Sequence, residues 1–133
     1  MTKPLADHFR LLARYNTGAN KRLYDACTKL TDEYRKTDRK GFFHSIHGTL
    51  NHLLVGDRVW KARFEGGTSP STGLDALLYE EFDALRTARM AEDERITTFV
   101  ESLDDDYIAG LIVYINNGAS PGRLDAFIAE AFF

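Results

Sequence analysis

The segment from Gly41 to Phe64 most constrains the fold, because its apolar residues recur with the period of an α-helix. The recurring positions lie alternately three and four residues apart, which places them on one face of a helix. They are Phe43, Ile46, Leu50, Leu53, Asp57, Trp60 and Phe64. All but Asp57 are apolar, so we expect this face to pack against other helices.

Asp57 is a carboxylate within that apolar face, and a buried carboxylate needs a partner. It could accept a hydrogen bond from a neighbouring helix in a structural role, or it could be a ligand-binding group or orient one. Asn16 interrupts the apolar face of an earlier helix in the same way. We therefore predict that Asn16 and Asp57 are buried and lie near each other or near Asn20.

Two more long helices are predicted on either side. The first extends from about Leu5 to Leu30, and the third from about Leu74 to Leu103 with a cap near Ser71 or Thr72. The first has the apolar face Leu5, Phe9, Leu12, Asn16, Ala19, Leu23, Ala26 and Leu30. The third has apolar positions near its two ends, whereas residues 86–95 between them are polar and predicted to be exposed.

The C-terminal part has a different character. Tyr107 to Gly118 is rich in β-branched and aromatic residues and ends in an Asn-Gly turn signal, so we expect an extended segment with at most a short strand. Leu124 to Phe133 resembles the first turns of a fourth helix. The sequence thus predicts an all-α fold in one domain, residues 1–133: an up-and-down four-helix bundle with antiparallel neighbours and a truncated fourth helix.

The histidines lie on or near the segment of strongest helical period. His44 and His47 have the spacing that two metal ligands on one helix can use, but near a helix start an exposed polar face is the ordinary interpretation. His52 has Gly48 and Gly56 one turn away on either side. Glycine weakens a helix, so this pair indicates close helix approach or room around the ring. Either would make His52 the wall of a cavity, facing a pocket or a solvent-filled groove.

Composition excludes several classes of protein. A net charge of −3 gives no electrostatic attraction for nucleic acid, and no apolar run approaches the length of a membrane span. The single cysteine, Cys27, cannot form an internal disulfide, and we interpret it as a small core residue. The acidic run Asp104 to Asp106 is interpreted as a solvated helix end. The absence of a secretion signal predicts a cytoplasmic protein.

Two stretches, YNTGANKRLYDAC and SIHGTLNHLLVGDRVWKARF, resemble the DinB (damage-inducible) family, also described as DinB/YfiT-like. The resemblance covers most of the chain. It implies a four-helix bundle, usually a homodimer, with a divalent metal such as zinc or nickel held by three histidines. The position of one ligand corresponds to His52. The better understood members implied by this resemblance are thiol-dependent transferases, isomerases and hydrolases.

The sequence departs from the family where the other two ligands are expected. The family has a stretch like NHxxHHRGQ in its fourth helix, and here no histidine follows His52. We therefore expect the metal site to be absent or incomplete. Two hypotheses follow: a metal-dependent protein acting on small electrophiles or thiol conjugates, or a metal-free homodimeric binding module or inactive remnant. A short fourth helix would leave the seam of Leu50, Leu53 and Trp60 open. We predict a two-fold homodimer in which this seam or the terminal Phe132 and Phe133 meet the second copy, and the alternative is that residues 107–115 cover the seam within one subunit.

Overall fold

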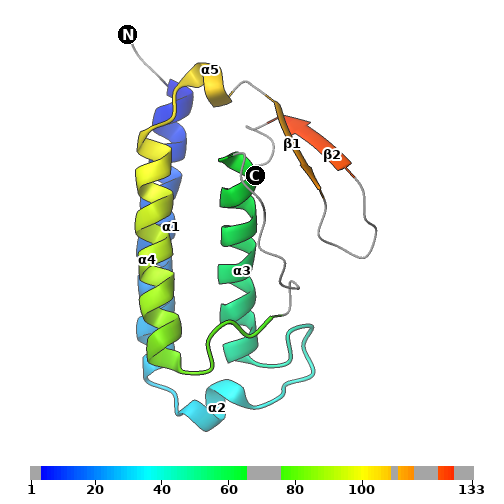
Figure 1. The fold of residues 1–133 in the computed structure, drawn as a ribbon. Coiled ribbons are helices and arrows are strands. Elements are labelled where there is room, and N and C mark those ends of the chain that lie inside the picture. Colours follow the sequence, from blue (N-terminus) through cyan, green and yellow to red (C-terminus); the bar gives the residue numbers. More distant parts are fainter. Residues whose placement is uncertain (1–3, 66–75, 109–110, 116–122, 128–133) are drawn as a thin grey trace.

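The computed structural model describes residues 4–65, 76–108, 111–115 and 123–127, and Figure 1 shows their arrangement. The elements in chain order are α1 (Pro4–Thr28), α2 (Asp32–Lys36), α3 (Ile46–Phe64), α4 (Phe82–Glu101), α5 (Asp105–Ile108), β1 (Leu111–Ile115) and β2 (Arg123–Phe127). The three long helices form the body, with α1 packed along α4 and α3 packed against α4. The predicted all-α helical bundle is confirmed.

The directions of the helices differ from a simple alternation. α3 and α4 run the same way, and α1 runs opposite to both (Figure 1). Asn51 near the start of α3 bonds Tyr79 just before α4, whereas the ring of Phe64 at the end of α3 stacks 6.3 Å from that of Phe99 near the end of α4. The prediction of antiparallel neighbours is therefore wrong for this pair. The connection at residues 65–81 is long enough to return, because the 19 residues of α3 span only about 28 Å.

The buried face of α1 is rotated from the predicted one. Its buried residues are Ala6, Phe9, Ala13, Tyr24 and Cys27, and of these only Phe9 was on the predicted face. Leu12 and Leu23, which were predicted to be buried, are 37% and 40% exposed. The physical reason is the pairing with α4: small alanine side chains let the two backbones approach closely, and the leucines are left at the side of the contact.

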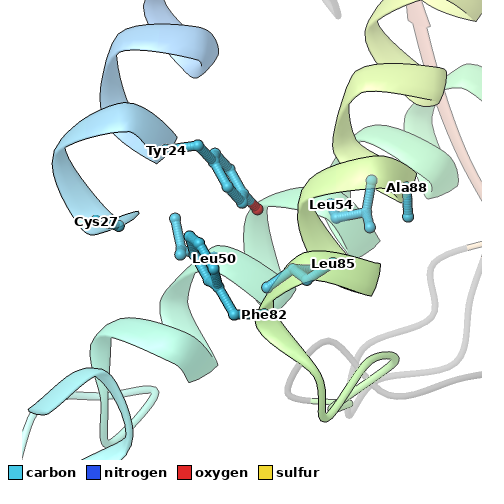
Figure 2. Packing of buried hydrophobic residues seen from close by; sticks show 7 residues of the cluster. All are labelled: Tyr24, Cys27, Leu50, Leu54, Phe82, Leu85 and Ala88. Atoms are coloured by element: carbon cyan, nitrogen blue, oxygen red, sulfur yellow. The ribbon is translucent and has the colours of Figure 1, made fainter. Parts of the chain in front are cut away.

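The core has two parts along the bundle. The first, shown in Figure 2, joins all three long helices through Tyr24, Cys27, Leu50, Leu54, Phe82, Leu85 and Ala88. The second joins α1 to the end of α4 through Ala6, Phe9, Ala13, Val100 and Leu103. Cys27 is thus a small core residue, as predicted, and burial raises the pKa of its thiol. Leu53, predicted in the buried seam, is 44% exposed because α3 turns Leu50 and Leu54 toward its neighbours.

α3 begins later than predicted, at a well-formed cap. The Ser45 side chain accepts a hydrogen bond from the Gly48 N–H at 2.9 Å. A Cβ at Gly48 would lie 2.2 Å from the carbonyl oxygen of Phe43, so glycine is required here by close approach of the preceding loop. At Gly56 a Cβ would meet nothing within 4 Å. Residue 44, predicted inside this helix, lies outside it with a φ of 68°.

The start of α4 is also later than predicted, because the residues before it are fixed to α3. Asn51, with 0% exposure, accepts from the Tyr79 N–H at 3.1 Å and donates to the Tyr79 carbonyl at 3.3 Å. His47 Nε2 lies 2.8 Å from the same carbonyl. His47 is 2% exposed, so its predicted place on an exposed face is wrong, whereas His44 is exposed as predicted.

At the C-terminal end, β1 and β2 form an antiparallel pair with register from Leu111↔Phe127 to Ile115↔Arg123. The extended segment predicted from residue 107 is confirmed in part, because residues 111–115 form the short strand β1. It is wrong for Tyr107 and Ile108, which belong to helix α5. The predicted fourth helix is wrong over residues 124–127, which belong to β2, and its remainder lies outside the described residues. β-branched residues in β1 favour strand pairing over continuation as helix. In the described parts of the chain, no helix has both the length and the apolar character to cross a membrane.

Candidate functional site

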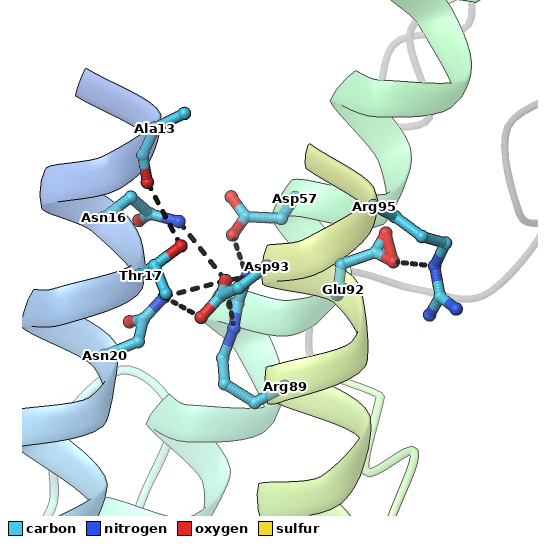
Figure 3. Close-up of polar contacts among 9 residues, drawn as sticks. All are labelled: Ala13, Asn16, Thr17, Asn20, Asp57, Arg89, Glu92, Asp93 and Arg95. Carbon is cyan, nitrogen blue, oxygen red and sulfur yellow. Dashed lines mark hydrogen bonds and ion pairs between the residues drawn. The ribbon is translucent and has the colours of Figure 1, made fainter. Parts of the chain in front are cut away.

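A buried ion-pair network joins the three long helices near their middles (Figure 3). Arg89 of α4 is 2% exposed and donates to Asp93 Oδ1 from Nε at 3.1 Å and from Nη2 at 2.7 Å. The same Nη2 donates to Asp57 Oδ2 on α3 at 2.5 Å. From α1, Asn16 and Asn20 donate to Asp93 Oδ1 at 3.3 and 3.1 Å. The polar residues that interrupt the helical faces therefore satisfy one another.

This network agrees with the predicted association of Asn16, Asn20 and Asp57, with two corrections. Asn16 and Asp57 are joined through Asp93 and Arg89 and not directly. Asn16 and Asp57 are also not fully buried, and the Asp57 side chain is 40% exposed. Asp57 therefore contributes one oxygen to the buried network and is accessible from outside it.

The sequence prediction missed the α4 half of the network. Residues 86–95 were predicted to be exposed, yet Arg89, Glu92 and Asp93 are 2%, 4% and 3% exposed. A signal was present in the spacing: Arg89 and Asp93 continue the helical stripe of Leu85 and Ile96. Polar residues that continue an apolar stripe are candidates for a buried network when a facing stripe is interrupted as well.

The charges in the network shift the pKa values of its members. Burial lowers the pKa of Arg89, but the carboxylates of Asp57 and Asp93 outweigh burial and leave that pKa raised. Burial raises the pKa of the Asp93 carboxyl, and the charge and hydrogen bonds of Arg89 offset only part of the rise. Nearby, burial raises the pKa of Tyr24 to about 12. The guanidinium is thus held in its charged form between two carboxyl groups.

Beside this network lies a groove of about 760 Å³, which is lined by residues of α1, α3 and α4. The groove is lined by Phe9, Leu12, Ala13, Tyr15, Asn16 and Ala19 of α1, by Asp57, Trp60, Lys61 and Phe64 of α3, and by Ile96, Phe99 and Val100 of α4. Most of these side chains are apolar or aromatic, and the polar ones are Asn16, Asp57 and Lys61. A concave apolar surface with a few polar groups is the usual composition of a small-molecule site.

Aromatic contacts order one wall of the groove. The Trp60 and Phe64 rings lie 5.9 Å apart, and Phe64 stacks on Phe99 at 6.3 Å with an interplanar angle of 18°. Tyr107 of α5 packs edge-on to Phe99 at 6.3 Å, and its hydroxyl donates to the carbonyl of Phe64. The wall is therefore supported from α3, α4 and α5, so its shape does not depend on one side chain.

His52, the residue that the resemblance implies as a metal ligand, lies elsewhere on α3. Its ring is half-buried and stacks on that of Phe43, with centroids 3.7 Å apart and an interplanar angle of 17°. It is not among the residues that line the groove. The described residues contain no group of three His, Cys, Asp or Glu side chains able to hold a metal ion, so they do not supply the implied ligand set. The role of His52 stays a prediction.

Comparison with known proteins gives the family. A search of curated proteins found no match. The DinB family model matches residues 1–119 of the 133 in this chain. That span includes all three long helices, the buried network and every residue that lines the groove. The chain therefore belongs to the DinB family.

Proposed function

We propose that this DinB-family protein is a binding module for a small, largely apolar molecule, which lies in the groove lined by α1, α3 and α4. The observation that carries the proposal is the groove itself. Its volume of about 760 Å³ falls within the range of roughly 300–1,000 Å³ that is usual for small-molecule sites. Aromatic walls supply contact area, and Asn16 and Asp57 supply polar groups that orient a ligand.

The buried network makes the polar side of the groove rigid. Asn16 and Asp57 are held by Asp93 and Arg89, which are themselves almost fully buried. A ligand would therefore meet groups already in position and would lose little affinity in ordering them. This preorganisation supports binding at this groove.

Family membership also supports a competing hypothesis, a metal-dependent enzyme with His52 as one ligand and zinc or nickel as the metal. The remaining donors would have to come from outside the described residues or from a second subunit. Elemental analysis of the purified protein separates the hypotheses. One tightly held metal ion per chain that is lost in His52→Ala would favour the enzyme.

The predicted two-fold homodimer remains a proposal. Exposed apolar side chains support it, including Leu11 at 57% and Tyr15 at 67% on α1 and Leu53 at 44% on α3. β1 lies beside α3, which favours in part the alternative that this segment covers the bundle within one subunit. Sedimentation over a range of concentrations checks the proposal, and a species that remains a monomer at high concentration excludes it.

Binding at the groove can be measured through Trp60, the single tryptophan of the chain, because it lines the groove. We expect the neutral probe N-phenyl-1-naphthylamine to change Trp60 fluorescence saturably with one site per chain. Ala19→Phe fills the groove and should weaken binding by about tenfold or more. Ala26→Phe, on the exposed surface of the same helix, is the matched control and should bind like wild type. No binding, or equal binding in Ala19→Phe, would refute the proposal.

A further inference from the structure

We infer that the ligand of this groove is an organic cation with an apolar body, whose charged group lies against Asp57. The inference rests on the proposed function, since it names the class of molecule that the groove selects. It follows from the charge of the buried network, from the position of Asp57 and from the character of the walls.

The network carries unequal charge. Arg89 provides one positive charge, whereas Asp57 and Asp93 provide two carboxylates. The partners recorded for Asp93, namely Arg89, Asn16 and Asn20, are all donors, which suits an ionised carboxylate. The network therefore carries one uncompensated negative charge, which an approaching cation would balance.

The geometry places this excess charge at the groove. Asp93 is 3% exposed and cannot be reached from solvent, whereas the Asp57 side chain is 40% exposed and lines the groove. Asp57 Oδ2 is occupied by Arg89, and within the described part of the chain no hydrogen-bond donor reaches Oδ1. Figure 3 shows this second oxygen directed away from Arg89. An incoming N–H⁺ group could therefore bond Oδ1 without displacing any described partner.

The neighbouring charges do not cancel this site. Lys61 also lines the groove, but its Nζ lies 2.7 Å from Glu65 Oε1, so that pair is neutral on its own. The Arg63 guanidinium lies 4.5 Å from the centroid of the Trp60 ring, and Arg63 does not line the groove. Because Asp57 does line the groove, we place the charged group of the ligand at Asp57. Its apolar body then lies along the aromatic wall, where Phe9, Phe64 and Phe99 provide contact area.

The test uses three molecules with one body and different charges: 4-phenylbutylamine, 4-phenylbutan-1-ol and 4-phenylbutyrate. Calorimetric titration of the full chain at neutral pH gives the three affinities. A charge-assisted hydrogen bond exceeds a neutral one, so we expect the amine to bind about tenfold or more tightly than the alcohol, and the acid to bind most weakly. The amine should also lose affinity as salt rises.

Two variants locate the charge. Asp57→Asn keeps an acceptor for Arg89 and should reduce the difference between amine and alcohol to within about twofold. Asp25→Asn also removes a carboxylate that pairs with an arginine of α4, but outside the groove, and should keep the wild-type preference. Equal affinities for amine and alcohol in wild type, or a preference unchanged in Asp57→Asn, would overturn the cation inference and leave the groove proposal standing. If none of the three molecules binds, the cation inference fails, and the groove proposal is decided separately by the N-phenyl-1-naphthylamine titration.

Discussion

Replacing Arg89 by methionine tests how much the buried network contributes to stability. Arg89 supplies two of the hydrogen bonds to Asp93 Oδ1, and its removal leaves a carboxylate that is 3% exposed with only two amide donors, from Asn16 and Asn20. Breaking a buried pair in this way costs about 3–5 kcal/mol, because the remaining charge has no compensation. Asp57→Asn should cost about 1 kcal/mol or less, since that side chain is 40% exposed and can be solvated.

The assay is urea denaturation, in which both the midpoint and the dependence of the free energy of unfolding on urea concentration are compared between variants. Arg86→Met is the matched control, because Arg86 lies on the same helix but pairs with Asp25, which is 52% exposed. We expect the control to cost less than about 1 kcal/mol. The double variant Arg89→Met/Asp93→Asn should recover about 2 kcal/mol of the single-variant loss, since it removes the uncompensated charge.

The pH dependence gives a second check with a defined sign. Burial raises the pKa of Asp93 above its ordinary 3.8, so the folded protein holds this proton more tightly than the unfolded chain. Such a group disfavours folding as pH rises through the folded pKa, and the penalty disappears below the unfolded pKa. Without Arg89 the pKa should rise further. The loss in free energy of unfolding caused by Arg89→Met should therefore become smaller on acidification. A loss under about 1 kcal/mol at neutral pH, or a loss that does not change with pH, would refute the reasoning.

Further variants test individual contacts. Gly48→Ala should destabilise the protein by more than about 1 kcal/mol, because its Cβ would meet the preceding carbonyl at 2.2 Å, whereas Gly56→Ala in the same helix should stabilise by about 0.5–1 kcal/mol in urea titrations. Tyr24→Phe removes a buried hydroxyl that lacks a hydrogen-bond partner among the described residues, so it should be neutral or stabilising by about 1 kcal/mol at neutral pH. Wild type should lose stability between pH 10 and about 12, where the unfolded tyrosine ionises and the folded one does not, and this loss should be smaller in the variant. Asn51→Ala leaves the Tyr79 N–H without its acceptor and should lower the free energy of unfolding by about 1–3 kcal/mol; an unchanged thermal midpoint would contradict the contact.

The sequence predicted the helices well because their periodicity is local information. The spacing of apolar residues located the three long helices and associated Asn16 with Asp57. It did not identify the buried face of α1, since Leu12 looks more suitable for burial than Ala13 until the close approach of α4 is known. Side-chain size at a helix contact is set by the partner, which a single sequence does not specify.

Polar residues were the harder part of the site. Arg89 and Asp93 were interpreted as a solvated stretch because charged residues are rarely buried alone, and only their placement opposite Asn16 makes burial favourable. His47 was misplaced for a similar reason, because its partner is the backbone carbonyl of Tyr79, 32 residues away in the chain. The groove itself depends on how α1, α3 and α4 pack together, which no periodicity reports.

The shared direction of α3 and α4 has a consequence for the order in which the chain assembles. Asn16 and Asn20 meet Asp93 across 77 and 73 positions, so the α1–α4 contact forms only after a long loop has closed. Contacts between distant positions slow the folding of small domains relative to bundles in which each helix packs on the next. We expect the Asn51–Tyr79 hydrogen bonds to lower the entropy cost of closing that loop, because they hold the residues just before α4 beside α3. Native-state hydrogen exchange should accordingly show α1 and α4 opening together as one cooperative unit.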